Sequence, residues 1–269
     1  MDYKVLAFDI DGTLVNSDKK ITPATKDAIQ KAADKGCRVV IASGRPVQGI
    51  RRYAKELNLK EHNGYILAYN GGALLRCSDG AHVKEKMLPR CYYEEIYLLA
   101  KECGVNIMTY DGDDVISENT NDKYLRLEAG INGLGIKEVP DLLAHLTYEV
   151  PKFLMLGDGD YLAEVEKKVY RQLHDRMDVY RSEPFFLEIM PKGINKASGL
   201  STLLDEIGAT REELMTFGDG YNDLSMIKYA GMGVAMSNGN DTVKAEADFI
   251  APSNDNDGIA YTLEKFVLD

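Results

Sequence analysis

The chain has 269 residues, of which 45% are hydrophobic and 28% are charged, and its formal net charge is −11. This length exceeds a typical single domain and favours one large or two modest domains. An acidic surface argues against nucleic acid and anionic membranes as partners, because both are bound through clustered Lys and Arg. It also repels a phosphorylated substrate, so a phosphate site in this chain requires local positive charge from a metal ion or a buried lysine.

The sequence contains no sign of export or membrane insertion. No segment approaches the roughly 18 apolar residues that a spanning helix requires. The N-terminal apolar stretch is short and interrupted by Asp9 and Asp11, unlike a signal peptide. The four cysteines form no CxxC pair, which favours reduced thiols over disulfides or zinc ligands. We therefore expect a soluble, cytoplasmic protein.

The first 70 residues alternate between strand and helix patterns. Val5 to Ile10 is an apolar run ended by Asp-Gly, which predicts a buried strand. Thr22-Pro23 supplies an N-cap and an N1 proline for a helix that ends near Gly36. Further strands are predicted at Arg38–Ala42 and Tyr65–Tyr69, with a helix between them. This alternation predicts βαβ units and a parallel sheet covered by helices on both faces.

After about residue 84 the pattern changes. Turn signals at Asp79-Gly80 and Asp111-Gly112 predict hairpins. Helices are predicted at Tyr93–Cys103, Asp122–Ala129, Pro140–His145 and Tyr161–Leu173. Strands are predicted at Val105–Thr109, Phe153–Leu156, Val179–Arg181 and Phe185–Met190. The mixture predicts an α+β module with a largely antiparallel sheet.

Strands and helices alternate again from about residue 192. The predicted elements are a helix at Lys196–Ile207, a strand at Leu214–Phe217, a helix at Asn222–Ala230, a strand at Gly233–Ala235 and a closing helix from about Gly258. The expected fold is therefore α/β, with a doubly wound, Rossmann-like parallel-sheet core and an inserted α+β domain. We expect residues 1–84 and 191–269 to form the core and residues 85–190 to form the insertion.

The first chemical motif is Asp9-Ile10-Asp11-Gly12-Thr13, directly after the first predicted strand. In an open parallel sheet, ligands bind outside the carboxyl ends of the strands. Aspartates at i and i+2 place two carboxylates at that edge, where one can act as nucleophile and the other as general acid and base. A plain Asp-Gly turn is the alternative interpretation.

The second motif is Gly218-Asp219-Gly220-Tyr221-Asn222-Asp223, which follows another predicted strand. Mg²⁺ prefers one or two carboxylates, with water and phosphate oxygens completing its octahedron. We expect Asp219 to be a direct ligand, with Asn222 and Asp223 holding waters or the loop. An ordinary loop with a helix N-cap at Asn222 is the alternative.

Two shorter segments suit phosphate binding. Ser43-Gly44-Arg45 offers a hydroxyl and backbone N–H groups near a helix N-terminus, where anions bind readily. Lys196 lies at a predicted helix start, where the macrodipole disfavours a cation unless it faces an anion such as phosphate. A common Ser-Gly turn and a solvated lysine are the alternatives.

Taken in their order along the chain (Asp9, Ser43, Lys196 and Gly218–Asp223), these four segments resemble the haloacid dehalogenase superfamily of phosphohydrolases, and the resemblance covers essentially the whole chain. The long insertion is similar to the α/β (C2B-type) cap of the Cof-type subfamily, which selects the substrate. Asn70-Gly71-Gly72 resembles the NG turn of that subfamily.

The resemblance implies a role for each motif residue. Asp9 would be the nucleophile and Asp11 the acid and base. The phosphate contacts would be Ser43, Gly44, Lys196 and Asn222. A Mg²⁺ ion would be held by Asp9, the backbone carbonyl of Asp11 and Asp219, with Asp223 supporting.

We therefore expect a Mg²⁺-dependent phosphatase that dephosphorylates small metabolites, such as sugar phosphates, through an aspartyl-phosphate. Two alternatives stay open. One is a sugar phosphomutase, in which an acceptor sugar takes the phosphoryl group before water does. The other is a non-catalytic, metal-dependent binder of phosphorylated ligands. The sequence does not identify the substrate, the cap residues that select it, or the oligomeric state.

One further loop resembles a metal site without matching it. Ser253 to Gly258, followed by Glu264, nearly fits a calcium loop, but its first position is Ser rather than Asp. We expect a polar loop that caps the final helix. Similar NDxDG loops occur in the Cof-type group, which would place Asn254 and Asp255 beside the active site, and we assign them no chemistry.

Overall fold

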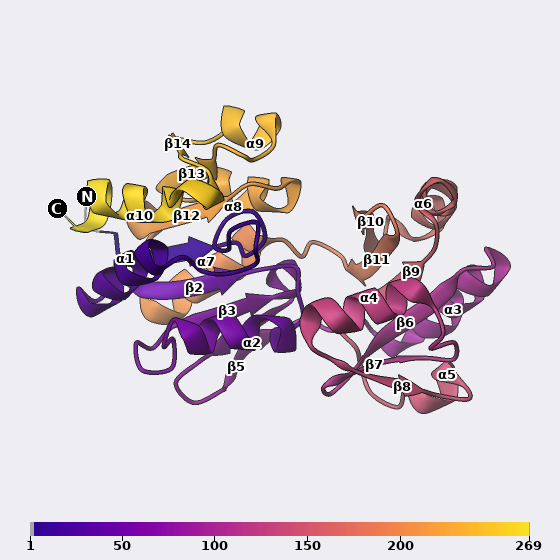
Figure 1. The fold of residues 1–269 in the computed structure, drawn as a ribbon. Coiled ribbons are helices and arrows are strands. Elements are labelled where there is room, and N and C mark those ends of the chain that lie inside the picture. Colours follow the sequence, from indigo (N-terminus) through magenta and orange to yellow (C-terminus); the bar gives the residue numbers. More distant parts are fainter. Residues whose placement is uncertain (1–2, 269) are drawn as a thin grey trace. The chain divides into compact units, whose positions relative to one another are not determined.

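The structure is a computed structural model that describes residues 3–268, and it divides into two compact units (Figure 1). Unit 1 contains the chain up to Glu85 and again from Asn195, and unit 2 is Lys86–Ile194. The second crossing therefore falls after Ile194, whereas the sequence pattern placed it after residue 190. Lys192 and Gly193 both bind the Asp178 carboxylate of unit 2, which keeps them in that unit.

Unit 1 is built from alternating strands and helices. Its strands are β1 (Val5–Phe8), β2 (Arg38–Ala42), β3 (Tyr65–Ala68), β4 (Ala73–Arg76), β5 (His82–Glu85), β12 (Leu214–Gly218), β13 (Met232–Met236) and β14 (Phe249–Ala251). Its α-helices are α1 (Pro23–Asp34), α2 (Val47–Glu56), α7 (Lys196–Ile207), α8 (Leu224–Tyr229), α9 (Asp241–Ala245) and α10 (Gly258–Leu263). Short helical turns are η1 (Tyr69–Gly71), η3 (Arg211–Glu213), η4 (Tyr221–Asp223), η5 (Asn254–Asn256) and the π-helical η6 (Glu264–Leu268).

The strands of unit 1 form one sheet in the order β14-β13-β12-β1-β2-β3-β4-β5 (Figure 1). The pairs from β14 to β3 are parallel, as the βαβ alternation predicts. The last two strands, β4 and β5, join the sheet at the β3 edge in antiparallel pairs. The turn η1 folds β4 back along β3, and the Asp79-Gly80 turn folds β5 back along β4, each without a crossover helix.

Helices cover both faces of this sheet. One face carries α7 and α8, whose Leu200, Leu203 and Met226 pack with Val5 and Val40 of the central strands. The helices α1, α2 and α10 pack against strands β2, β3 and β14 respectively, and each buries apolar residues. The α/β class and doubly wound arrangement predicted from the sequence are therefore confirmed.

Unit 2 has its own sheet and helices. The strands are β6 (Asn106–Asp111), β7 (Asp114–Ser117), β8 (Gly135–Glu138), β9 (Phe153–Leu156), β10 (Met177–Glu183) and β11 (Phe186–Pro191). The helices are α3 (Tyr93–Glu102), α4 (Lys123–Asn132), α5 (Leu142–His145), α6 (Gly159–Leu173) and the turn η2 (Arg90–Tyr92). The sheet order is β10-β11-β9-β6-β7-β8, and every pair is antiparallel except β7–β8.

Three short elements have no clear pattern in the sequence: β8, α9 and β14. Each has only three to five residues. All four residues of β8 are exposed, so no alternation of apolar and polar residues marks it. Within residues 3–268, no helix combines the length and apolarity needed to cross a bilayer.

The sheet of unit 2 buries an ion pair on one face. Lys152, just before β9, places its Nζ 3.0 Å from Oε2 of Glu188 on β11, and both side chains are at most 5% exposed. The Tyr110 ring lies 5.8 Å from the same Nζ. Because two charges removed from water must compensate each other, neither is tolerated alone.

We expect Glu188→Leu to lower the free energy of unfolding by about 3–5 kcal/mol, because it removes the Glu188 carboxylate that balances the buried Lys152 charge. Adding Lys152→Met should recover most of that loss. Urea denaturation followed by circular dichroism measures both. Lys123→Met, which breaks an exposed pair with Asp158, is the control and should have little effect. A double variant as unstable as Glu188→Leu would contradict this account.

Candidate active site

The predicted site residues of unit 1 lie at the carboxyl ends of its parallel strands. Asp9 follows β1, Asp219 follows β12 and Ser43 follows β2. These strands are neighbours in the sheet, so their ends meet at one edge. This is the edge where open α/β sheets bind ligands.

Lys196 is the centre of the charged groups at this edge. It is the first residue of α7, and its side chain is 0% exposed. Its Nζ lies 2.5 Å from Oδ1 of Asp9 and 2.5 Å from Oδ1 of Asp223. The Asn195 side chain caps the helix by accepting from the Ser198 N–H, which fixes where α7 begins. The capped helix start therefore aims the ammonium into the carboxylates.

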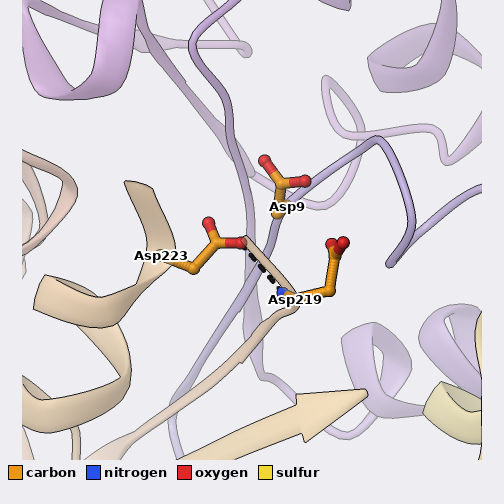
Figure 2. Close-up of side chains that lie close together, drawn as sticks. All are labelled: Asp9, Asp219 and Asp223. Carbon is orange, nitrogen blue, oxygen red and sulfur yellow. Dashed lines mark hydrogen bonds between the residues drawn. The ribbon is translucent and has the colours of Figure 1, made fainter. Parts of the chain in front are cut away.

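Asp219 and Asp223 complete a group of three carboxylates with Asp9 (Figure 2). One oxygen from each residue lies within 4.8 Å of the others. Oδ2 of Asp223 accepts the backbone N–H groups of Asp219 and Gly220, both at 2.9 Å, so it closes its own loop. Oδ1 of Asp219 accepts the Thr13 hydroxyl at 2.7 Å.

Gly12 is required by this close approach. Its φ is +81°, a left-handed conformation that favours glycine. A Cβ at this position would collide with the Asp219 carboxylate. Gly12 therefore lets the turn after β1 pass directly over Asp219, the candidate metal ligand.

Burial raises the pKa of Asp9, and the neighbouring Asp223 and Asp219 raise it further, against the opposing charge of Lys196. Burial likewise raises the pKa of Asp219 to about 6, against the hydrogen bond from Thr13. Burial opposes the charge of Lys196, but Asp223 and Asp9 outweigh it and raise its pKa. Three carboxylates thus share one ammonium, and the cluster is short of positive charge.

The donor set fits a hard divalent cation. Both oxygens of Asp223 are occupied by Lys196 and by backbone N–H groups, so Asp223 suits a supporting role. Among residues 3–268, no protein group donates a hydrogen bond to Oδ2 of Asp9 or to Oδ2 of Asp219. Two carboxylate oxygens and nearby backbone carbonyls are the ligands that Mg²⁺ prefers.

Asp11 points to a different set of partners. Arg45 donates to both of its oxygens, from Nε at 2.8 Å and from Nη2 at 2.9 Å, and Lys19 donates to Oδ1 at 2.9 Å. Burial would raise the pKa of Asp11, but the bonds and charge of Arg45 and Lys19 outweigh it and hold that pKa below its ordinary value. The structure therefore keeps the Asp11 carboxylate ionised and tied to two cations.

The predicted phosphate contacts lie around Asn70. Ser43 is buried, its hydroxyl accepts the Arg45 N–H at 3.2 Å, and its carbonyl accepts the Asn70 N–H at 2.9 Å. Asn222 donates from Nδ2 to Oδ1 of Asn70 at 3.2 Å. The Asn70 side chain also approaches Gly44 closely. Ser43, Gly44 and Asn222 are thus linked through one residue.

Four residues to which the sequence patterns assigned no role take part in these contacts: Thr13, Lys19, Arg45 and Asn70. Three of them lie inside motifs or turns that the sequence marks, next to residues with assigned roles. Asn70 has φ +53°, a conformation in which asparagine is enriched, so its Asn-Gly context is a usable signal. Lys19 carries no signal, because a lysine in a polar loop is usually solvated.

Solved structures of known proteins share this fold. A haloacid dehalogenase-like hydrolase from Bacteroides thetaiotaomicron is similar, with a TM-score of 0.94 and 44% identity, covering 98% of this chain and 99% of that one. The subclass IIB sugar phosphatase BT4131 of the same superfamily is similar with a TM-score of 0.80 and 25% identity, covering 99% of this chain and 100% of that one.

Sequence comparison agrees with the structural likeness. The 5-amino-6-(5-phospho-D-ribitylamino)uracil phosphatase YcsE of Bacillus subtilis is 30% identical over 269 residues, which are 100% of this chain and 97% of that protein. Residues 6–263 match the family of haloacid dehalogenase-like hydrolases. The predicted enzyme class, a phosphatase, is confirmed. The chain belongs to the haloacid dehalogenase-like hydrolases.

Proposed function

We propose that this enzyme is a Mg²⁺-dependent phosphatase that hydrolyses small phosphorylated metabolites through an aspartyl-phosphate on Asp9. The observation that carries the proposal is the group of three carboxylates around the buried Lys196. A cation at this group would balance the excess negative charge and attract a phosphate dianion. The net charge of −11 otherwise repels a phosphoryl group, so binding requires such local positive charge.

In the first step, an oxygen of Asp9 attacks phosphorus opposite the leaving alcohol. The new P–O bond forms to Asp9 while the bond to the alcohol oxygen breaks, and Asp11 donates a proton to that oxygen. In the second step, Asp11 takes a proton from water as the water oxygen attacks phosphorus. The Asp9–phosphorus bond breaks, and inorganic phosphate and the free Asp9 carboxylate are formed.

Asp11 must change partners for this chemistry. A carboxylate gripped by both nitrogens of Arg45 cannot deliver a proton to a leaving oxygen. The mechanism therefore requires the Asp11 side chain to turn from Arg45 and Lys19 toward the substrate and to take up a proton from solvent before the first turnover. The proton that Asp11 takes from water in the second step then restores the acid for the next cycle. The exposed fraction of the Asp11 side chain, 41%, leaves room for that rotation.

Lys196 and the cation share the work of charge neutralisation. We propose that Asp9, the Asp11 carbonyl and Asp219 hold Mg²⁺, which when bound neutralises charge on the phosphoryl oxygens and on Asp9. Lys196 keeps Asp9 oriented through the bond to Oδ1. Asp223 holds Lys196 and the Asp219 loop. Ser43, Gly44 and Asn222 are proposed to bind the remaining phosphoryl oxygens.

We propose that unit 2 is the cap that selects the leaving group, and that sugar phosphates or related phosphorylated polyols are the substrates. Support comes from two similar proteins, one named a sugar phosphatase and the other a phosphatase of a phosphoribitylamino-uracil. Both substrates carry a hydroxylated carbon chain next to the phosphate. A panel of sugar, polyol and nucleotide phosphates, scored by phosphate release, tests this class.

The first test is metal-dependent turnover. The purified enzyme should release phosphate from p-nitrophenyl phosphate with Mg²⁺, and EDTA should abolish the release until Mg²⁺ is restored. The physical reason is that three clustered carboxylates otherwise repel the substrate dianion. Turnover that is unchanged in EDTA would contradict the proposed metal role.

The same preparation separates the alternatives. Incubation with a sugar phosphate should give free sugar and inorganic phosphate in equal amounts. An isomeric sugar phosphate without inorganic phosphate would support the mutase instead. Binding without any turnover across the panel would support the non-catalytic binder.

The second test removes the two reacting carboxylates in turn. Asp9→Asn should reduce turnover to background, because an amide is not a nucleophile. Asp11→Asn should reduce kcat by about 10²–10⁴-fold, the usual contribution of a positioned acid or base. Asp241→Asn, whose side chain is 99% exposed, is the control and should be fully active. Full activity in Asp9→Asn would overturn the assignment.

The third test is the pH dependence of metal affinity. Protons compete with the metal for carboxylates whose pKa is raised, and for Asp219 that pKa is about 6. Apparent Mg²⁺ affinity should therefore fall as pH drops through about 6, by roughly tenfold per unit for each proton displaced. Mg²⁺ titrations of activity from pH 5 to 8 measure it.

Thr13→Val is the matched variant for this test. It removes the hydrogen bond that lowers the pKa of Asp219, so the loss of Mg²⁺ affinity should begin at a higher pH than in the parent enzyme. An affinity that stays constant over the whole range in both proteins would mean that other groups hold the metal.

A further inference from the structure

The loop Ser253–Asp257 does more than precede α10. Its last residue, Asp257, is the N-cap residue of α10, but the Asp257 side chain makes no capping bond to that helix. Its carboxylate instead accepts the Thr22 hydroxyl at 2.5 Å, at the other end of the segment that follows β1. Asp257 itself has φ +53°, a left-handed conformation that is uncommon for residues other than glycine. The loop is therefore shaped toward the β1 segment.

Two asparagines connect this loop to the turn that carries Asp9 and Asp11. Asn238, after β13, donates from Nδ2 to the Gly12 carbonyl at 2.8 Å. Its Oδ1 accepts the backbone N–H of Asn254 at 3.1 Å. Asn254 donates from its own Nδ2 to the Val15 carbonyl at 2.9 Å. The pair therefore holds the turn at two points, Gly12 and Val15.

These two points lie on either side of a tight turn. Backbone bonds join Leu14 to Asp9 and Val15 to Ile10 across it, and a bridge pairs Asp11 with Val15. These contacts tie residues 9–15 into one unit. Any displacement of Gly12 or Val15 would displace the main chain of Asp11.

The Asn238 loop also supports the second motif. The N–H of Asn240 donates to the Asp219 carbonyl at 2.9 Å. Gly239 lies so close that a Cβ would meet the Asp219 main chain at 2.9 Å. One short loop after β13 therefore fixes the main chain at Gly12 and at Asp219, which come from strands β1 and β12.

Asp255 ties the outer part of the same segment. Its carboxylate accepts the Ser17 N–H at 2.8 Å and the Ser17 hydroxyl at 2.7 Å. With the bond of Asp257 to Thr22, the loop after β14 spans the β1 segment from Val15 to the start of α1. None of these bonds involves the Asp9 or Asp11 side chains.

We propose that Asn238 and Asn254 are positioning residues of the active site, which act through the main chain of the β1 turn to set the relative places of Asp9, Asp11 and Asp219. This inference rests on the proposed phosphatase function. Their side-chain hydrogen bonds go to main-chain groups and not to the reacting carboxylates. Each holds a carbonyl of the turn, so its loss allows the reacting carboxylates to shift while leaving the phosphate contacts in place.

The test compares Asn238→Ala and Asn254→Ala with Asn256→Ala. Asn256 is an exposed member of the same loop whose Nδ2 bonds only to the Ser253 hydroxyl among the described contacts, so it is a matched control. Outer partners of a reacting centre typically contribute 10–100-fold. We expect kcat on p-nitrophenyl phosphate with saturating Mg²⁺ to fall by about that factor in the first two variants. KM should remain near the parent value, and Asn256→Ala should match the parent enzyme.

The double variant adds a second readout. Because Asn254 and Asn238 are hydrogen-bonded to each other and hold the same turn, losing either one weakens the support given by the other. Their losses should therefore not multiply, and the double variant should be little slower than the slower single one. Should Asn238→Ala lose its fold by circular dichroism, Asn238→Asp replaces it. That variant keeps the acceptor for Asn254 and lacks the donor to Gly12, with Asn256→Asp as the charge-matched control.

Three outcomes would overturn the inference while leaving the phosphatase intact. These are an unchanged kcat in folded Asn238→Ala and Asn254→Ala, a rise in KM at constant kcat, and an equal loss in the Asn256 control. A parent enzyme without metal-dependent turnover would instead overturn the proposed function, and the inference with it.

Discussion

The whole site depends on one buried ammonium shared between carboxylates. Lys196 is enclosed at the start of α7 and binds Asp9 and Asp223, while Asp219 completes a group of three acids. One positive charge cannot balance three negative ones in a region shielded from water. Burial and this excess of negative charge raise the pKa values of Asp9 and Asp219. A divalent cation bound here would bring the charge of the group close to zero, so three uncompensated carboxylates would no longer repel a phosphate dianion.

The loops that carry these charged residues must be held in fixed positions. Apart from Lys196, which begins α7, the site residues lie in loops that follow the ends of parallel strands, and loops are the most mobile parts of a fold. Here the loops brace one another: Thr13 binds Asp219, Asn238 binds the Gly12 carbonyl, and Asp223 closes its own turn. Gly12 allows the contact because no side chain keeps the two turns apart. Precision in this site therefore comes from hydrogen bonds between loops as much as from the sheet beneath them.

Asp11 is the residue whose observed partners differ most from its proposed role. A proton donor should carry a proton, yet Arg45 and Lys19 keep this carboxylate ionised. The two cations are well placed to meet an incoming phosphorylated ligand, and a ligand that draws them away would free Asp11. Substrate binding and activation of the acid would then be one event, which would limit proton transfer in the absence of substrate.

The fold class, the βαβ order of unit 1 and the motif positions of Asp9, Asp219 and Lys196 could be predicted from the sequence. Apolar runs and turn residues are local signals, and parallel strands must share an edge. The hydrogen bonds of Arg45 and Lys19 to Asp11, and those of Asn238 and Asn254 to the β1 turn, are visible only in the folded structure. Those contacts join residues from 8 to 239 positions apart. They depend on where loops meet in space, which no periodicity within a single segment encodes.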